Sequence, residues 1–90
     1  MKTIKELANM GERVYVHLND EETAMRFLRQ AESEGFTFGD GVSPTDRHWS
    51  DLYAIHPEGT LNYVGTVGRI EYASDADSVV RIEYEEETAN

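Results

Sequence analysis

The chain has 90 residues, contains no cysteine and carries a net charge of −10 at pH 7. A domain of this size buries only about 60–65% of its unfolded surface. Neither disulfides nor a cysteine-rich metal site can compensate, so we expect one domain that forms a homo-oligomer. No apolar run reaches the roughly 20 residues of a membrane span and no signal peptide opens the chain, which predicts a cytoplasmic protein without a membrane partner.

The first third of the chain predicts a helix, a strand and a second helix. Thr3 and Glu6 match a capping box at the start of a short helix. Residues 13–18 alternate between apolar and polar side chains, as in a strand with one buried face. Asn19 is expected to cap the second helix, whose apolar residues follow one face. Gly35 suits the left-handed position that ends such a helix.

The rest of the chain predicts turns and strands. The expected pieces are an extended piece at 36–38, a turn at 39–41, another turn or a brief helical turn at 43–46, a hairpin of 51–55 with 60–64, and a second hairpin of 69–72 with 78–84. Together these elements predict an α+β fold in a single domain of residues 1–90. It has a short N-terminal helix, one strand, and one amphipathic helix packed on a four- to five-stranded, mainly antiparallel sheet. Residues 86–90 are expected to be frayed.

The acidic residues are unevenly placed along the chain. Residues 71–87 hold seven acids and a single arginine, so this stretch alone carries −6. Such a charge opposes direct binding to nucleic acid, because phosphates would be repelled. Two interpretations stay open: a solvated surface that keeps the protein soluble, or a nucleic-acid mimic that offers carboxylates to a basic groove on another protein.

The middle of the chain differs from both flanks. Residues 35–69 hold six of the seven glycines, both prolines and the only tryptophan, but only four of the eighteen acids. Glycine-rich turns, flat side chains and a few polar groups together are typical of a binding segment. The aromatic side chains of this segment are Phe36, Phe38, Trp49, Tyr53 and Tyr63. The presence of these five rings is explained equally well by a hydrophobic core and by a ligand-binding pocket.

Polar residues that could complete such a pocket accompany the rings. Arg47 and Arg69 could bind a phosphate, and Asn62 could hydrogen-bond a base edge, while aromatic rings stack on it. His48 lies beside Arg47 in the same segment. These residue types in one segment favour a nucleotide pocket, for which we expect no cofactor.

Other chemistries have weaker signals. The run Asp46-Arg47-His48 with neighbouring hydroxyl residues matches no known catalytic spacing, so we expect no enzyme. The histidines lack ligand spacing, so we expect no metal site. Asp75 and Asp77 predict a turn better than a calcium loop. The glycines at 65 and 68 favour a bend between strands, with a phosphate cradle as the alternative.

The run AESEGFTFGDGVSPTDRHWSDLYAIHPEGTLNYVG, within residues 31–68, resembles the first-described family of phage anti-Thoeris proteins. Members of that family bind a cyclic ADP-ribose isomer, or related cyclic oligonucleotides, and withhold it from a bacterial defence effector. Their layout places helices before an antiparallel sheet, and their pockets lie between subunits. The resemblance implies the same activity here, in the cytoplasm of an infected bacterial host.

By analogy with that family, individual residues of this chain can be assigned roles in ligand binding. The resemblance implies Trp49 or Tyr53 for stacking, Asn62 for a polar contact, and Arg47 and Arg69 for phosphate. The leading hypothesis is therefore a phage protein that sequesters a cyclic nucleotide without cleaving it. The alternative is an acidic inhibitor of the anti-CRISPR type, which mimics DNA and blocks a nucleic-acid-binding defence protein.

Overall fold

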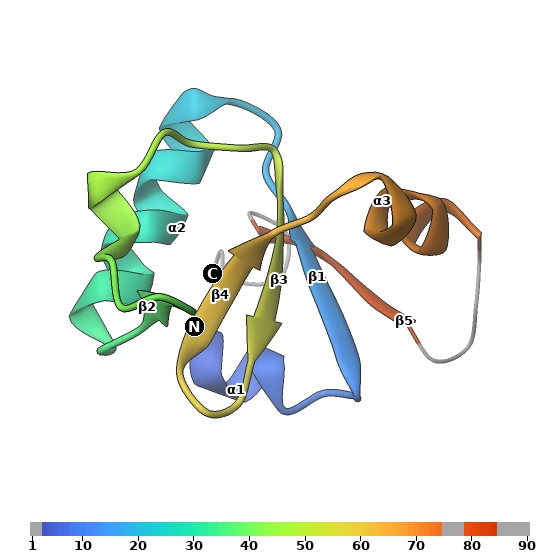
Figure 1. The fold of residues 1–90 in the computed structure, drawn as a ribbon, viewed down its shortest axis with the longest axis horizontal. Helices are drawn as coiled ribbons and strands as arrows, with labels where there is room; N and C mark the ends of the chain where they lie inside the picture. The colour runs from blue at the N-terminus through green and yellow to red at the C-terminus, as the bar shows by residue number, and fades with distance from the viewer. Residues whose placement is uncertain (1–2, 75–78, 85–90) are drawn as a thin grey trace.

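The computed structural model describes residues 3–74 and 79–84 (Figure 1). In chain order its elements are α1 (Ile4–Ala8), β1 (Arg13–His17), α2 (Glu21–Ser33), β2 (Thr37–Phe38), the 3-10 helix η1 (Pro44–Asp46), β3 (Leu52–His56), β4 (Thr60–Tyr63), α3 (Thr66–Ala73) and β5 (Val79–Glu83). The expected fraying of residues 86–90 and the turn at Asp75 and Asp77 lie outside the described residues. Within the described part, no helix is both long and apolar enough to cross a membrane.

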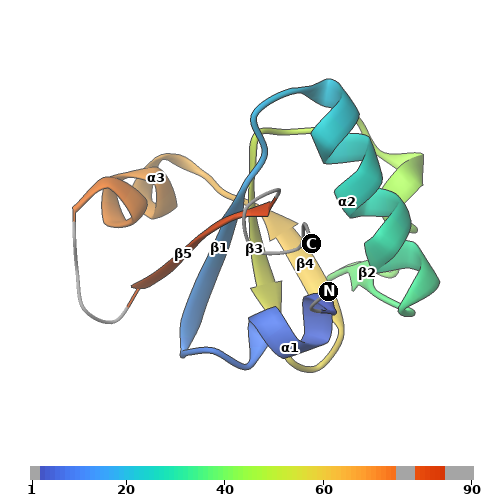
Figure 2. The ribbon, with the colours of Figure 1, turned by 180° about the vertical axis from the view of Figure 1, so that it is seen from behind.

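The five strands form one mixed sheet in the order β2-β4-β3-β1-β5. The inner pairings of β4 with β3 and of β3 with β1 are antiparallel, whereas β2 and β5 join the two edges in parallel. The chain reaches each edge strand through a helix, α2 before β2 and α3 before β5 (Figures 1 and 2). The predicted α+β fold, with helices packed on a five-stranded sheet, is confirmed.

Helix α1 forms as predicted and docks through a contact that the sequence does not reveal. Both hydrogen bonds of the capping box between Thr3 and Glu6 are present. The Glu34 carboxylate, just after α2, accepts the backbone N–H groups of Ile4 and Lys5 at 2.9 and 3.1 Å. A carboxylate at a helix N-terminus satisfies free N–H groups and opposes the positive end of the helix dipole. The contact attaches the five-residue α1 to the C-terminal end of α2.

Helix α2 begins one residue later than expected. Asp20, not Asn19, is the N-cap, and its carboxylate accepts the Thr23 N–H at 2.8 Å. This bond lowers the pKa of Asp20. At the other end Gly35 has φ +86°, and the N–H groups of residues 35 and 36 bond back to the carbonyls of Glu32 and Ala31. That pattern is a Schellman motif, so the predicted role of Gly35 is confirmed.

One face of the sheet, the main face, packs against α1 and α2. Its core contains side chains from both helices and from every strand, among them Leu7, Phe27, Val16, Tyr53 and Ile82, each with at most 1% of its surface exposed. Tyr84, which follows β5, also belongs to this core. Most of the apolar surface that folding buries lies on this side.

The opposite face, the second face, is covered by α3 and not by a hairpin. The strand predicted at 69–72 and the bend between strands predicted at Gly65 and Gly68 are both wrong, because Gly65 is the N-cap of α3 and Gly68 lies within the helix. A hairpin would place β5 antiparallel to its neighbour in the chain, but β5 runs parallel to β1. Reaching a parallel position requires a long crossover, which usually contains a helix. A small cluster of Tyr15, Leu52, Val64 and Val79 fills the space beneath α3.

Candidate functional site

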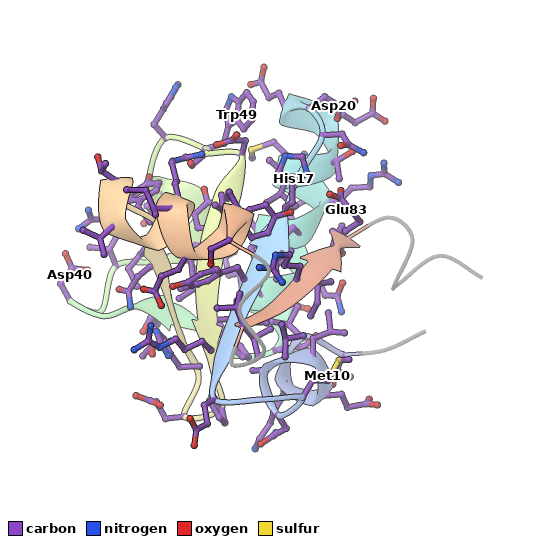
Figure 3. The ribbon with its side chains drawn as sticks, turned by 90° about the vertical axis from the view of Figure 1, so that its right-hand side faces the viewer. Met10, His17, Asp20, Asp40, Trp49 and Glu83 are labelled. Atoms are coloured by element: carbon purple, nitrogen blue, oxygen red, sulfur yellow. The ribbon has the colours of Figure 1, made fainter. Side chains whose placement is uncertain are left out.

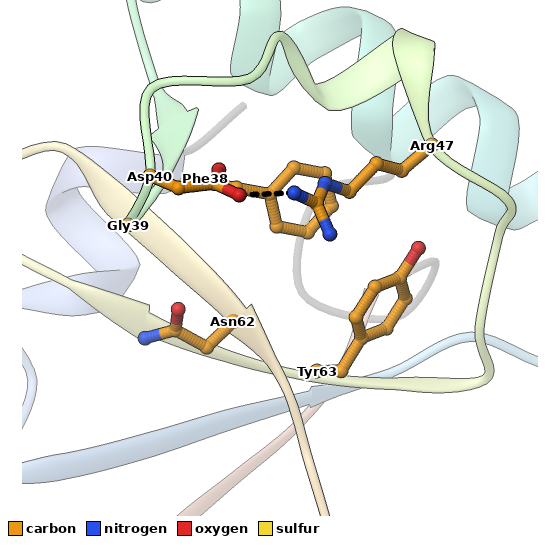
Figure 4. Close-up of a pocket in the computed structure, with 6 residues that line it drawn as sticks. All are labelled: Phe38, Gly39, Asp40, Arg47, Asn62 and Tyr63. Atoms are coloured by element: carbon orange, nitrogen blue, oxygen red, sulfur yellow. Dashed lines mark hydrogen bonds and ion pairs between the residues drawn. The ribbon is translucent and has the colours of Figure 1, made fainter.

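A pocket opens where β2 ends and β4 continues beyond it. β2 pairs with β4 only through Thr37 with Thr60 and Phe38 with Leu61, so the following residues of β4 lack a β2 partner. Gly41, with φ +90°, turns the chain away there, and its N–H donates to the Phe38 carbonyl at 2.8 Å. The pocket has a volume of about 370 Å³ and is lined by Phe38, Gly39, Asp40, Arg47, Asn62 and Tyr63 (Figure 4).

Arg47 lies across the pocket from the strand edge. It follows η1 in an extended conformation, and its guanidinium carbon lies 5.1 Å from the centre of the Phe38 ring. The guanidinium also forms an ion pair with the Asp40 carboxylate (Figure 4). The two side chains are 38% and 57% exposed. An ion pair this exposed stabilises a fold by only about 0–1 kcal/mol, so a ligand can displace it at low cost.

Asp40 is held at the rim of the pocket by its own turn. Its Oδ1 atom accepts the backbone N–H of Val42 at 3.2 Å, an Asx-type contact. The neighbouring Gly39 gives space to Asn62, because a Cβ at position 39 would lie 3.3 Å from the Asn62 Oδ1 atom. The glycine and the aspartate therefore shape the rim in different ways.

The aromatic surface of the pocket is Tyr63. Its ring stacks on Phe38 with centroids 5.2 Å apart, and its hydroxyl donates to the His48 carbonyl. Phe38 is 4% exposed whereas Tyr63 is 41% exposed, so Tyr63 is the ring that a ligand could reach. Asn62 lies on the same strand, with its amide nitrogen 3.1 Å from Nε2 of His56.

These groups bring three binding capacities to the rim of one pocket, with Tyr63 and Asn62 on opposite sides of β4 because successive strand residues alternate faces. Tyr63 offers a flat apolar surface, Asn62 offers a donor and an acceptor, and Arg47 offers a cation. The charges of Arg47 and Asp40 cancel, which leaves the lining formally neutral in a chain with a net charge of −10. An anionic ligand meets less repulsion here than the overall charge suggests.

The structure brings together two of the six residues expected from sequence, Arg47 and Asn62. Tyr53 is completely buried in the main-face core, where burial raises its pKa to about 12 and its hydroxyl accepts the Ser50 N–H at 2.9 Å. A ring without exposed surface cannot stack on a ligand, so the expected role of Tyr53 is wrong. Trp49 packs against the same core as a partly buried side chain and does not line the pocket.

The remaining expected residues lie at the margin or elsewhere. His48 is exposed and does not line the pocket, although its backbone carbonyl accepts the Tyr63 hydroxyl. Arg69 belongs to α3 and forms an ion pair with Asp51 at 2.8 Å. This contact lowers the pKa of the Asp51 carboxyl and raises the pKa of Arg69. Arg69 therefore lies outside the pocket lining, where it links α3 to Asp51.

Two pairs of hydrogen-bonded polar side chains lie outside the pocket. Nδ1 of His17 on β1 lies 2.9 Å from the Glu83 carboxylate on β5, beside the Tyr72 ring (Figure 3). The hydroxyl of Thr45, in η1, donates to the Glu32 carboxylate of α2 at 2.7 Å. Among the described residues, no three or more histidines or acids are grouped as a metal site would require.

Asp40 was not predicted from the sequence, and Tyr63 was one of five rings that a core or a pocket explained equally well. A usable signal was present in the hairpin, because Tyr63 lies directly opposite Tyr53. Both rings therefore point to the same face, and the one nearer the sheet edge must be the more exposed.

Comparisons with family models, curated proteins and solved structures found no significant match.

Proposed function

We propose that this chain is a non-enzymatic binding protein that sequesters a cyclic nucleotide, a cyclic ADP-ribose isomer or a cyclic oligonucleotide, and so acts as a phage counter-defence protein in an infected bacterium. The observation that carries the proposal is that Arg47, Asn62 and Tyr63 line one open pocket at the sheet edge. A base stacks on Tyr63 and a phosphate approaches Arg47, while Asn62 offers a polar group at the opposite rim of the pocket. The biological setting rests on the family resemblance of residues 31–68.

The size of the pocket supports a particular mode of binding. Its volume of about 370 Å³ is near the lower end of the range for small-molecule sites. A pocket of this size holds one nucleoside unit and leaves the rest of a cyclic ligand outside. We propose that a second copy of the chain covers that exposed part, which agrees with the expected homo-oligomer. Sequestration then follows from mass action, because a tight binder in excess lowers the free signal.

The acidic stretch gives less support to DNA mimicry. Of its described carboxylates, Glu71 forms an ion pair with Arg13 and Glu83 lies beside His17. Carboxylates that already have partners within the chain are less available to a basic groove. The acids at 75, 77 and 85–87 lie outside the described residues.

Calorimetry against cyclic ADP-ribose isomers and cyclic di- and trinucleotides tests the proposal. The informative variant is Tyr63→Leu, because loss of one base–aromatic stack costs about 1–3 kcal/mol, or roughly five- to 150-fold in affinity. Tyr72→Leu is the matched control, since it removes a tyrosine ring on the second face. The ligand should be recovered intact after release. Absence of binding to every ligand, or equal losses in both variants, would exclude this function.

A further inference from the structure

The Asp40–Arg47 ion pair has a consequence for the ligands that the pocket accepts. Arg47 is the only cation among the six lining residues, and its guanidinium already contacts a carboxylate on the pocket rim. A ligand phosphate that binds Arg47 therefore either replaces the Asp40 carboxylate or shares the guanidinium with it, since arginine has five N–H donors. Asp40 stays nearby after replacement, because the Val42 N–H holds its Oδ1 atom in the turn.

We infer that Asp40 is a specificity-determining residue that makes the pocket favour phosphodiester nucleotides over phosphomonoesters, an inference that rests on the proposed nucleotide function. The reason is electrostatic. A phosphomonoester carries a charge of about −1.5 to −2 at pH 7, whereas a phosphodiester carries a single negative charge. Repulsion from a fixed carboxylate grows in proportion to the ligand charge, so Asp40 opposes the monoester more strongly.

This selectivity has a clear use for a protein that captures a cyclic signal. Linear nucleotides with terminal phosphates compete for any pocket that combines a stacking ring with an arginine. A paired arginine keeps enough attraction for a singly charged phosphate but loses much of its advantage for a terminal one. A neutral nucleoside does not interact with Arg47 through charge, so Asp40 leaves its binding unchanged.

The substitution Asp40→Asn isolates this effect. An asparagine keeps a carbonyl oxygen at the Oδ1 position, so it can still accept the Val42 N–H and hold the turn. It removes the negative charge and frees Arg47 for the ligand. Glu58→Gln is the matched control, because it removes one negative charge from the exposed loop of the β3–β4 hairpin, outside the pocket lining.

The experiment titrates three probes that share adenosine and differ in charge: adenosine, 3′,5′-cyclic AMP and AMP, followed by NMR at low salt. In Asp40→Asn we expect AMP to bind about tenfold more tightly, cyclic AMP about threefold more tightly, and adenosine equally. Glu58→Gln should leave all three affinities within twofold of the starting protein. The gain for AMP should shrink as salt is added, because the site is exposed.

The possible failures separate the two proposals. Binding of adenosine without any gain for AMP in Asp40→Asn overturns the role of Asp40 and leaves the nucleotide pocket standing. Equal gains in Asp40→Asn and Glu58→Gln also overturn it, since net charge alone then explains the change. If none of the three probes binds and the cyclic nucleotide panel fails as well, both the inference and the proposed function are wrong. A melting curve for each variant confirms that the fold is intact.

Discussion

The two faces of the sheet are covered by helices of very different strength. On the main face, the 13-residue α2 buries five of its side chains, and α1 adds three more. On the second face, the eight-residue α3 buries none, and leaves Val67 and Ile70 73% and 64% exposed. The comparison shows that the main face determines the stability of the fold, while the second face carries a lightly attached layer.

Polar contacts take the place of apolar burial in attaching α3. Arg69 forms an ion pair with Asp51, Glu71 forms one with Arg13, and Arg81 donates to the Tyr72 carbonyl. Each exposed ion pair contributes at most about 1 kcal/mol. The weak attachment predicts that α3 opens without unfolding the main face, as locally unstable segments of proteins do.

The largest change in the free energy of unfolding should come from the same leucine-to-alanine substitution made on each of the two faces. Leu28→Ala removes a fully buried side chain between α2 and the sheet, and Leu52→Ala removes one that is 2% exposed beneath α3. We expect losses of about 4 kcal/mol for Leu28→Ala and about 2 kcal/mol for Leu52→Ala, because α3 can settle into the cavity. Urea unfolding measures both. Equal losses would show that the two faces are equally rigid.

A smaller effect should follow from adding a methyl group under α3. A Cβ at Gly68 would lie 2.6 Å from the Val64 Cγ1 atom, so Gly68→Ala forces α3 away from the sheet. We expect a net loss of about 1 kcal/mol, since overpacking exceeds the gain in helix propensity. Hydrogen exchange should quicken in α3 and not in α2. In a Val64→Ala background the collision disappears, and Gly68→Ala should become neutral or stabilising.

The smallest effect concerns the ion pair at the base of α3. Asp51→Asn should cost about 0.5 kcal/mol at neutral pH, because the Asp51 side chain is 49% exposed and solvent screens the contact. The pKa of Asp51 is lowered from its ordinary value of 3.8 by the Arg69 hydrogen bond. Its contribution is therefore present above that value and lost as the pH falls through the lower folded-state pKa. A difference between the two proteins that persisted under strongly acidic conditions would contradict this assignment.

The sequence predicts the main face well because its signals are local. The capping box at Thr3, the apolar stripe of α2 and the left-handed position of Gly35 depend on neighbours within a few residues. The prediction for residues 66–73 was wrong because the signal that decides their structure is not local. Ile70 and Tyr72 alternate with polar residues as in a strand, and only the distant pairing of β5 with β1 requires a crossover there.

The same contrast between local and long-range signals explains which residues of the pocket could be predicted from the sequence. Arg47 and Asn62 could be selected because their segment is rich in glycine and poor in acid. Tyr53 and Tyr63 could not be ranked, because composition does not say which ring lies toward the sheet edge. Asp40 was missed because its role depends on Arg47, seven residues away along the chain, and on the turn that brings the two side chains together.

The parallel pairing of β5 with β1 joins one of the first elements of the described chain to its last. During translation β1 leaves the ribosome several seconds before β5, at ordinary rates of synthesis. Over that interval the nascent sheet presents β1 as an open edge, with unpaired backbone groups that a neighbouring chain could occupy. The last strand therefore completes the fold and also closes a site of misassembly, so truncation before Val79 should promote aggregation more than it reduces secondary structure.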